Sequence, residues 1–116
     1  MTRGNKYGAK GLKTEDGYFH SQGEYRRWQE LKLLERGKQI VGLKRGERHP
    51  LLVNGKTVGH YKPDYEYGDR KDEGIYEYIY EDFKGGPTHT EAAKLRIKLF
   101  EVLFNCKVLI TGKRTK

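Results

Sequence analysis

The chain has 116 residues, with 24 Lys and Arg against 16 Asp and Glu, which gives a net charge of +8. Its single cysteine excludes a disulfide framework and a cysteine-cluster zinc site, and no apolar run reaches the roughly 18 residues that cross a bilayer. We therefore expect one soluble domain of the cytoplasm, with no membrane partner and with an affinity for polyanions.

The apolar content is low for a globular domain. Leu, Ile, Val and Phe are few, although nine Tyr and one Trp supply large rings that bury well. A small domain with so thin a core can gain stability by pairing with a second copy. A homodimer is therefore a candidate assembly.

Basic charge is concentrated at the two ends of the chain. The charged residues of segment 1–13 are all Lys or Arg, and so are those of segment 111–116. Short basic arms commonly make non-specific phosphate contacts, although solubilising tails have the same composition. We predict a basic flexible arm over 1–17, a folded domain over 18–111 and a basic tail over 112–116.

The first predicted helix runs from Ser21 to Arg36. Ser21 and Glu24 form a capping box, and Gly37 provides the stop signal. At 100° per residue, Glu24 falls on the same side as Trp28. A carboxylate on an apolar face is costly unless a charged group meets it, so Glu24 is a candidate functional residue.

Strands are predicted next along the chain. Residues 39–44 form one, and residues 51–53 and 56–61 form a hairpin around Asn54-Gly55. Residues 68–74 are polar and predict a loop. Residues 75–84 alternate through their whole length and predict the clearest strand of the chain.

A second helix and a last strand complete the pattern. The helix is predicted over 88–105, begins with a Thr88 and Glu91 capping box, and carries Arg96 within its apolar arc. A short strand follows over 107–111. The order α-β-β-β-α-β predicts a mixed α/β domain with one sheet flanked by helices.

Alternation along 75–84 sorts its side chains. Asp82 and Lys84 share a face with three tyrosines, which we expect to pack beneath a helix, while Glu77 and Glu81 indicate that the opposite face is partly wet. The three tyrosines are Tyr76, Tyr78 and Tyr80.

Asp64 comes at the end of the preceding strand, and lies beside Asp82 if the two strands pair as a hairpin. With Glu24 directed inward from the first helix, three carboxylates would then meet. Clustered carboxylates repel one another unless a cation joins them, and oxygen ligands suit Mg²⁺ or Mn²⁺. A lysine two residues from such an aspartate is placed to act on a water or on a charged phosphate.

Pro63-Asp64 followed by Asp82-Phe83-Lys84 resembles the signature of the PD-(D/E)XK nucleases. More narrowly, four pieces within residues 18–111 are similar to a family of small phage and prophage nucleases often described only as a domain of unknown function. These pieces are Phe19-x-Ser21-x-x-Glu24, Pro63-Asp64, Glu81-Asp82-Phe83-Lys84-Gly85 and Lys94-Leu95-Arg96-x-Lys98-Leu99-Phe100.

The resemblance implies a restriction-endonuclease-like α-β-β-β-α-β core and a Mg²⁺- or Mn²⁺-dependent endonuclease acting on DNA in the host cytoplasm. Glu24, Asp64 and Asp82 would hold the metal, and Lys84 would serve the attacking water. The plan is similar to that of archaeal Holliday-junction resolvases, which implies a homodimer and a branched DNA substrate.

Basic side chains outside the tails are candidates for nucleic-acid contacts. Two alternatives stay open: a non-catalytic nucleic-acid-binding module whose tails do the binding, and a nuclease whose substrate is RNA. The candidate phosphate contacts are Arg26, Arg27, Arg45, Arg48, Lys94, Arg96 and Lys98.

Overall fold

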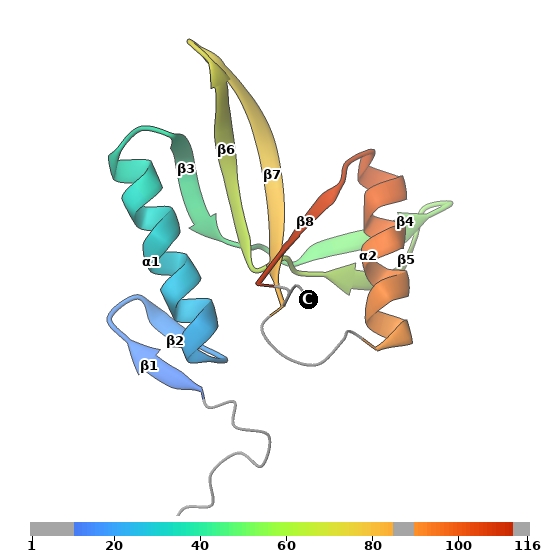
Figure 1. Ribbon diagram of the computed structural model, residues 1–116. Helices are drawn as coiled ribbons and strands as arrows, with labels where there is room; N and C mark the ends of the chain where they lie inside the picture. Colours follow the sequence, from blue (N-terminus) through green and yellow to red (C-terminus); the bar gives the residue numbers. More distant parts are fainter. Residues whose placement is uncertain (1–10, 85–89, 113–116) are drawn as a thin grey trace, which may run out of the picture.

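The computed structural model describes residues 11–84 and 90–112 and shows two helices and eight strands there (Figure 1). None of the described helices is long and apolar enough to cross a bilayer. The elements are β1 (Leu12–Thr14), β2 (Gly17–Phe19), α1 (Gln22–Arg36), β3 (Ile40–Arg45), β4 (His49–Val53), β5 (Lys56–Tyr61), β6 (Tyr65–Asp72), β7 (Ile75–Phe83), α2 (Glu91–Phe104) and β8 (Val108–Thr111).

A four-stranded sheet in the order β3-β6-β7-β8 forms the centre of the described structure. The β3–β6 and β6–β7 pairs are antiparallel, whereas β7 and β8 run parallel, as a strand–helix–strand crossover requires. The predicted α/β class is therefore confirmed. The hairpins β1–β2 and β4–β5 form two further small sheets of their own.

Strand β6 is the main departure from the predicted order. It runs through Asp72 and so occupies most of the segment predicted as a polar loop, which leaves a turn at Glu73-Gly74. The polar tip is stable as strand because its side chains pair across β6 and β7: Lys71 Nζ lies 3.1 Å from Asp69 and 3.2 Å from Glu77. β6, rather than the 56–61 hairpin arm, is thus the partner of β7.

The first helix forms as predicted. The Ser21 side chain accepts a hydrogen bond from the Glu24 amide at 3.1 Å, and Gly37 caps the other end. Just before it, β1 and β2 pair as a hairpin, so residues 12–17 of the expected arm are folded. Residues 1–10, 85–89 and 113–116 lie outside the described residues.

The second helix begins later than predicted and buries a different face. Its N-cap is Thr90, whose hydroxyl accepts from the Ala93 amide at 3.1 Å, while Thr88 lies outside the described residues. Phe100 is fully buried and Ile97 packs beside it, whereas Arg96, which was predicted within the apolar arc, is exposed. The apolar arc is therefore rotated from the predicted one.

Two apolar clusters cover the two faces of the sheet. On the α1 face, Trp28 stacks on Tyr65 with ring centroids 5.8 Å apart. On the other face, Phe100 of α2 packs on Tyr80 and on Tyr61 of the β4–β5 hairpin, with centroids 4.9 Å apart in both pairs. Of the three tyrosines expected beneath a helix, Tyr80 is covered, whereas the remaining two are about half exposed. Those two are Tyr76 and Tyr78.

Candidate functional site

Asp64 and Asp82 meet where β6 begins and β7 ends. The β6–β7 register pairs Tyr65 with Glu81, so the next position along brings Asp64 opposite Asp82. The Asp64 amide donates to the Glu81 carbonyl at 2.9 Å, and the Phe83 amide donates to Asp64 Oδ2 at 2.7 Å. Asp64 therefore meets Asp82 as predicted, but from the start of β6.

The segment before Asp64 is held rigidly. Pro63 is fully buried, and the Gly46 amide donates to the Asp64 carbonyl at 3.0 Å. A side chain at Gly46 would collide with the Pro63 carbonyl oxygen, so the close approach of these two segments requires glycine there. The Pro-Asp dipeptide owes its position to this contact as well as to the sheet.

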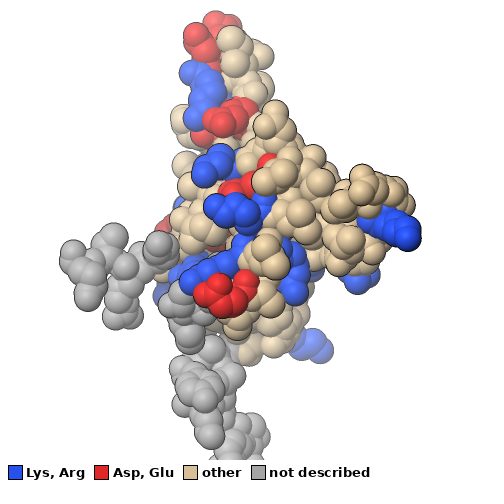
Figure 2. Space-filling view, turned by 90° about the vertical axis from the view of Figure 1, so that its right-hand side faces the viewer, with Lys and Arg blue, Asp and Glu red and all other residues tan. Residues whose placement is uncertain are grey.

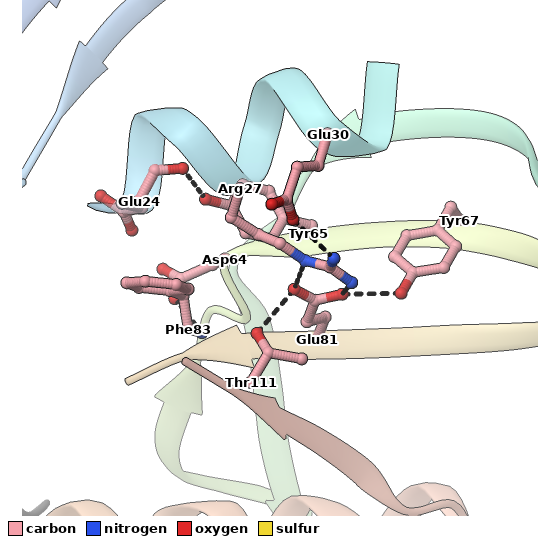
Figure 3. Close-up of polar contacts among 9 residues, drawn as sticks. All are labelled: Glu24, Arg27, Glu30, Asp64, Tyr65, Tyr67, Glu81, Phe83 and Thr111. Carbon is pink, nitrogen blue, oxygen red and sulfur yellow. Dashed lines mark hydrogen bonds and ion pairs between the residues drawn. The ribbon is translucent and has the colours of Figure 1, made fainter. Parts of the chain in front are cut away.

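Glu24 reaches the same place from the first turn of α1 (Figure 3). Its carboxylate accepts from the His20 amide at 2.8 Å, and its carbonyl accepts from the Tyr65 hydroxyl at 2.6 Å. The side chain is almost completely buried. Glu24 thus combines a capping role with a position beside Asp64, and Tyr65 ties that helix end to β6.

The carboxylates influence one another strongly. Burial, together with the neighbouring carboxyl groups of Asp82 and Glu24, raises the pKa of Asp64 to about 9. On the other side, the Tyr61 hydroxyl donates to Asp82 Oδ2 at 2.9 Å, and burial and the Asp82 charge raise the Tyr61 pKa well above its usual value. Carboxylates are thus held together in a partly desolvated place.

Lys84 completes the predicted set at the end of β7. It follows the strand directly, is half-buried, and its amide donates to the Thr111 carbonyl of β8 at 2.7 Å. The side chain of Lys84 projects from the same side of the extended chain as that of Asp82. The structure therefore brings all four predicted residues to one end of the sheet.

The donor set suits a hard cation. Asp64 contacts both Asp82 and Glu24, and carboxylate oxygens are the ligands that Mg²⁺ and Mn²⁺ prefer. Within the described segments, no group of three His, Cys, Asp or Glu side chains is already arranged as a cage for a metal. The carboxylate oxygens suit such an ion chemically, but they are arranged as two pairs, Asp64 with Asp82 and Asp64 with Glu24.

A cavity of about 370 Å³ opens beside Asp82, between the β4–β5 hairpin and α2. Two of the predicted phosphate contacts, Arg48 and Arg96, line it. Figure 2 shows several Lys and Arg side chains across the middle of the face that carries α2, with acidic side chains among them, and both acidic and basic side chains near the tip of the β6–β7 hairpin. The full lining is Arg48, His60, Tyr61, Lys62, Asp82, Ala93, Arg96 and Ile97.

Three of the other predicted phosphate contacts already interact with residues of the fold. Arg27 donates to Glu81 through Nε and Nη2 at 2.6 and 2.9 Å (Figure 3). Arg45 lies over the Phe19 ring at 3.8 Å from its centroid. Lys94 pairs with Glu91 at 3.6 Å, whereas Arg26 and Lys98 are exposed on their helices. The exposed pair carries no ion-pair partner among the residues described.

Two buried carboxylates have structural roles that the sequence pattern does not predict. Glu81, expected on a partly wet face, is fully buried and accepts from Arg27, from Tyr67 at 2.6 Å and from Thr111 at 2.7 Å. The signal for its burial was its position between Ile79 and Phe83, which pack against the α1 cluster.

Glu66 is the second of these carboxylates. It accepts from the Glu47 amide at 2.9 Å, lies 2.8 Å from His49 Nε2 and accepts from the Tyr78 hydroxyl at 2.7 Å. Burial alone would raise the pKa of Glu66, but these hydrogen bonds hold it below its usual range. The network fastens the β4–β5 hairpin to the central sheet, and so fixes Tyr61 beside Asp82.

Comparison with known proteins assigns the chain to a family. No curated protein and no solved structure matches the chain. The family model described as "Protein of unknown function (DUF1064)" matches residues 4–113, which include every residue of the site. The chain therefore belongs to the DUF1064 family.

Proposed function

We propose that the protein is a metal-dependent endonuclease of the PD-(D/E)XK class that hydrolyses phosphodiester bonds of DNA. The observation that carries the proposal is the meeting of Asp64 with both Asp82 and Glu24 at one end of the sheet. Glu24 lies on α1, Asp64 directly precedes β6 and Asp82 lies on β7, and Lys84 follows β7 at the same end. A solvated strand end would not require three carboxylates to be brought together against their mutual repulsion.

Each residue has a role in this proposal. Glu24, Asp64 and Asp82 would hold Mg²⁺ or Mn²⁺, which supplies a polarised phosphoryl oxygen and a more acidic water. Tyr61 fixes the orientation of Asp82 through its 2.9 Å hydrogen bond. The Lys84 ammonium orients the attacking water and stabilises the negative charge that develops on the phosphate.

The test is a cleavage assay with the purified full chain. Labelled four-way junction, linear duplex, single-stranded DNA and RNA are each incubated with Mg²⁺, Mn²⁺ or EDTA. We expect cutting only with metal, a loss of at least 100-fold in Asp82→Asn and Lys84→Ala, and binding retained in both. Asp69→Asn is the matched control, because Asp69 lies at the distant hairpin tip.

The same assay decides between substrates and against the rival. Preference for the junction would support the resolvase form of the proposal, and cutting of RNA alone would replace DNA with RNA. Binding that ignores metal, with no cutting of any substrate, would refute the nuclease and favour a non-catalytic binding module. The observation that keeps this rival in view is the net charge of +8.

We extend the proposal to a homodimer, which two cuts in a branched DNA would use. The outer surface of α2 supports it, since Leu95 and Val102 are 68 % and 69 % exposed. Val102→Lys should convert a dimer into a monomer in light scattering, whereas Asp69→Asn, near the distant tip of the β6–β7 hairpin, should not. A monomeric wild-type protein at 100 μM would refute this part.

A further inference from the structure

The cavity beside Asp82 is built from parts that the central sheet does not supply. His60 lies on β5, Lys62 follows it, Arg48 precedes β4, and Arg96 lies on α2. The hairpin is held in place by the Glu66–His49 contact, and α2 by the packing of Phe100 on Tyr61. The walls of the cavity are therefore fixed relative to Asp82.

The charge of the cavity walls is positive and uncompensated. Arg48, Lys62 and Arg96 have no ion-pair partner within residues 11–84 and 90–112, and Arg48 Nη2 lies 3.4 Å from His60 Nδ1. Many other cations are neutralised locally, as Arg27 is by Glu81. Three like charges converging on one hollow are stabilised by an anion.

The one acidic residue of the lining does not cancel this charge. Asp82 sits at the cavity edge, where Tyr61 already donates to it, and in the proposed reaction it faces the metal. The remaining wall, formed by Ala93 and Ile97, is apolar and suits a sugar rather than a second charge. A volume of about 370 Å³ accommodates a single nucleotide unit rather than a duplex.

We propose that this cavity is a subsite for one nucleic-acid phosphate and its attached sugar, held by Arg48, Lys62 and Arg96. Because the cavity lies beside Asp82, its phosphate would be a neighbour of the phosphate at which the strand is cut. This assignment rests on the proposed nuclease function. Phosphate binding itself does not, because it needs neither the metal nor Lys84. The subsite would bind one strand and position the adjacent phosphodiester bond at the carboxylates.

The test measures binding in EDTA, where no metal-dependent cutting occurs. The probe is a fluorescein-labelled 12-nucleotide single strand, read by anisotropy with the full chain. Lys62→Ala/Arg96→Ala should raise Kd at least tenfold and reduce the slope of log K against log salt by about 1 to 2. Lys56→Ala, on the same hairpin but outside the cavity, should leave both unchanged.

A charge deletion on the probe makes the test specific. Replacing one internal phosphate at a time by a neutral methylphosphonate should weaken wild-type binding most at one position, and that loss should vanish in Lys62→Ala/Arg96→Ala. An effect of the 5′-terminal phosphate alone would assign the cavity to a strand end instead. Wild-type affinity in the double variant, within twofold, would overturn the subsite.

The outcomes also separate the two proposals. If the protein cuts nothing but the double variant loses affinity, the nuclease fails and the subsite stands. If the protein cuts DNA and the double variant has unchanged Kd and KM, the subsite fails and the nuclease stands. With both correct, the double variant should raise KM at least tenfold while changing kcat less than threefold.

Discussion

Removing Arg27 should destabilise the fold without acting on the proposed chemistry. The Glu81 carboxylate has no exposed surface and accepts four hydrogen bonds, two of them from Arg27. The Glu81 contact raises the pKa of the Arg27 guanidinium further above its already high value, so this guanidinium stays charged at any ordinary pH. The Arg27→Met substitution keeps much of the apolar stem and deletes the charge.

The expected loss of stability follows from the Glu81 carboxylate, which stays buried without its cationic partner. Hydrogen bonds to charged groups contribute about 1.5–3 kcal/mol each, and leaving one partner of a buried ion pair alone costs about 3–5 kcal/mol. The side chain of Arg27 is 21 % exposed, so solvent screening of the pair is limited. Against a total stability of about 5–15 kcal/mol, we expect a loss of about 3–5 kcal/mol and a Tm lower by roughly 12–20 °C.

Urea unfolding followed by Trp28 fluorescence measures this loss, because the single tryptophan lies in the α1 cluster. Arg26→Met is the control, since Arg26 is exposed, and should change stability by less than about 0.5 kcal/mol. Arg27→Met/Glu81→Gln should recover part of the loss, because no charge is then left buried. A destabilisation below about 1 kcal/mol in Arg27→Met would contradict the reasoning.

Two further substitutions test other contacts. Gly46→Ala should lower the free energy of unfolding by about 1–3 kcal/mol and reduce any metal-dependent cleavage, because the added methyl group would displace Pro63. Gly59→Ala is the control, since a Cβ there meets only ordinary van der Waals contacts. It should change neither quantity in the same unfolding and cleavage assays. The lowered pKa of Glu66 contributes stability that is complete above its unfolded value of 4.5 and is lost as the pH falls through the lower folded value. The free energy of unfolding, measured with urea, should therefore fall more steeply below pH 4.5 for the wild-type protein than for Glu66→Gln. Equal slopes would show that the hydrogen bonds from Glu47, His49 and Tyr78 do not stabilise the carboxylate.

Local signals predicted the elements that local forces determine. The first helix carries its own start and stop in Ser21 and Gly37, and β7 carries its alternation, so both were predicted closely. Strand β6 was missed because its tip is polar and its stability comes from neighbours on both sides. No periodicity within Asp69–Asp72 distinguishes such a strand from a loop.

The site was predicted by residue type and chain order, and its supports were not. Glu24, Asp64 and Asp82 meet as expected, although Asp64 reaches Asp82 because it directly precedes β6, and not because the 56–61 strand pairs with β7. The partner of Arg27 lies 54 residues away, and no local pattern indicates it. For the same reason, the sequence did not show that Arg27 is neutralised by Glu81, and Arg27 was predicted as a phosphate contact.

The parallel pairing of β7 with β8 has a consequence for the order of events during synthesis. Until Val108–Thr111 has left the ribosome, β7 is an edge strand, and neither the Lys84 amide nor the Glu81 carboxylate has its Thr111 partner. The four predicted site residues span about 60 positions of sequence, from Glu24 to Lys84, so their assembly depends on long-range contacts that form late. A nascent chain would therefore contain the carboxylates before β8 pairs with β7. Any activity would begin only after β8 has docked.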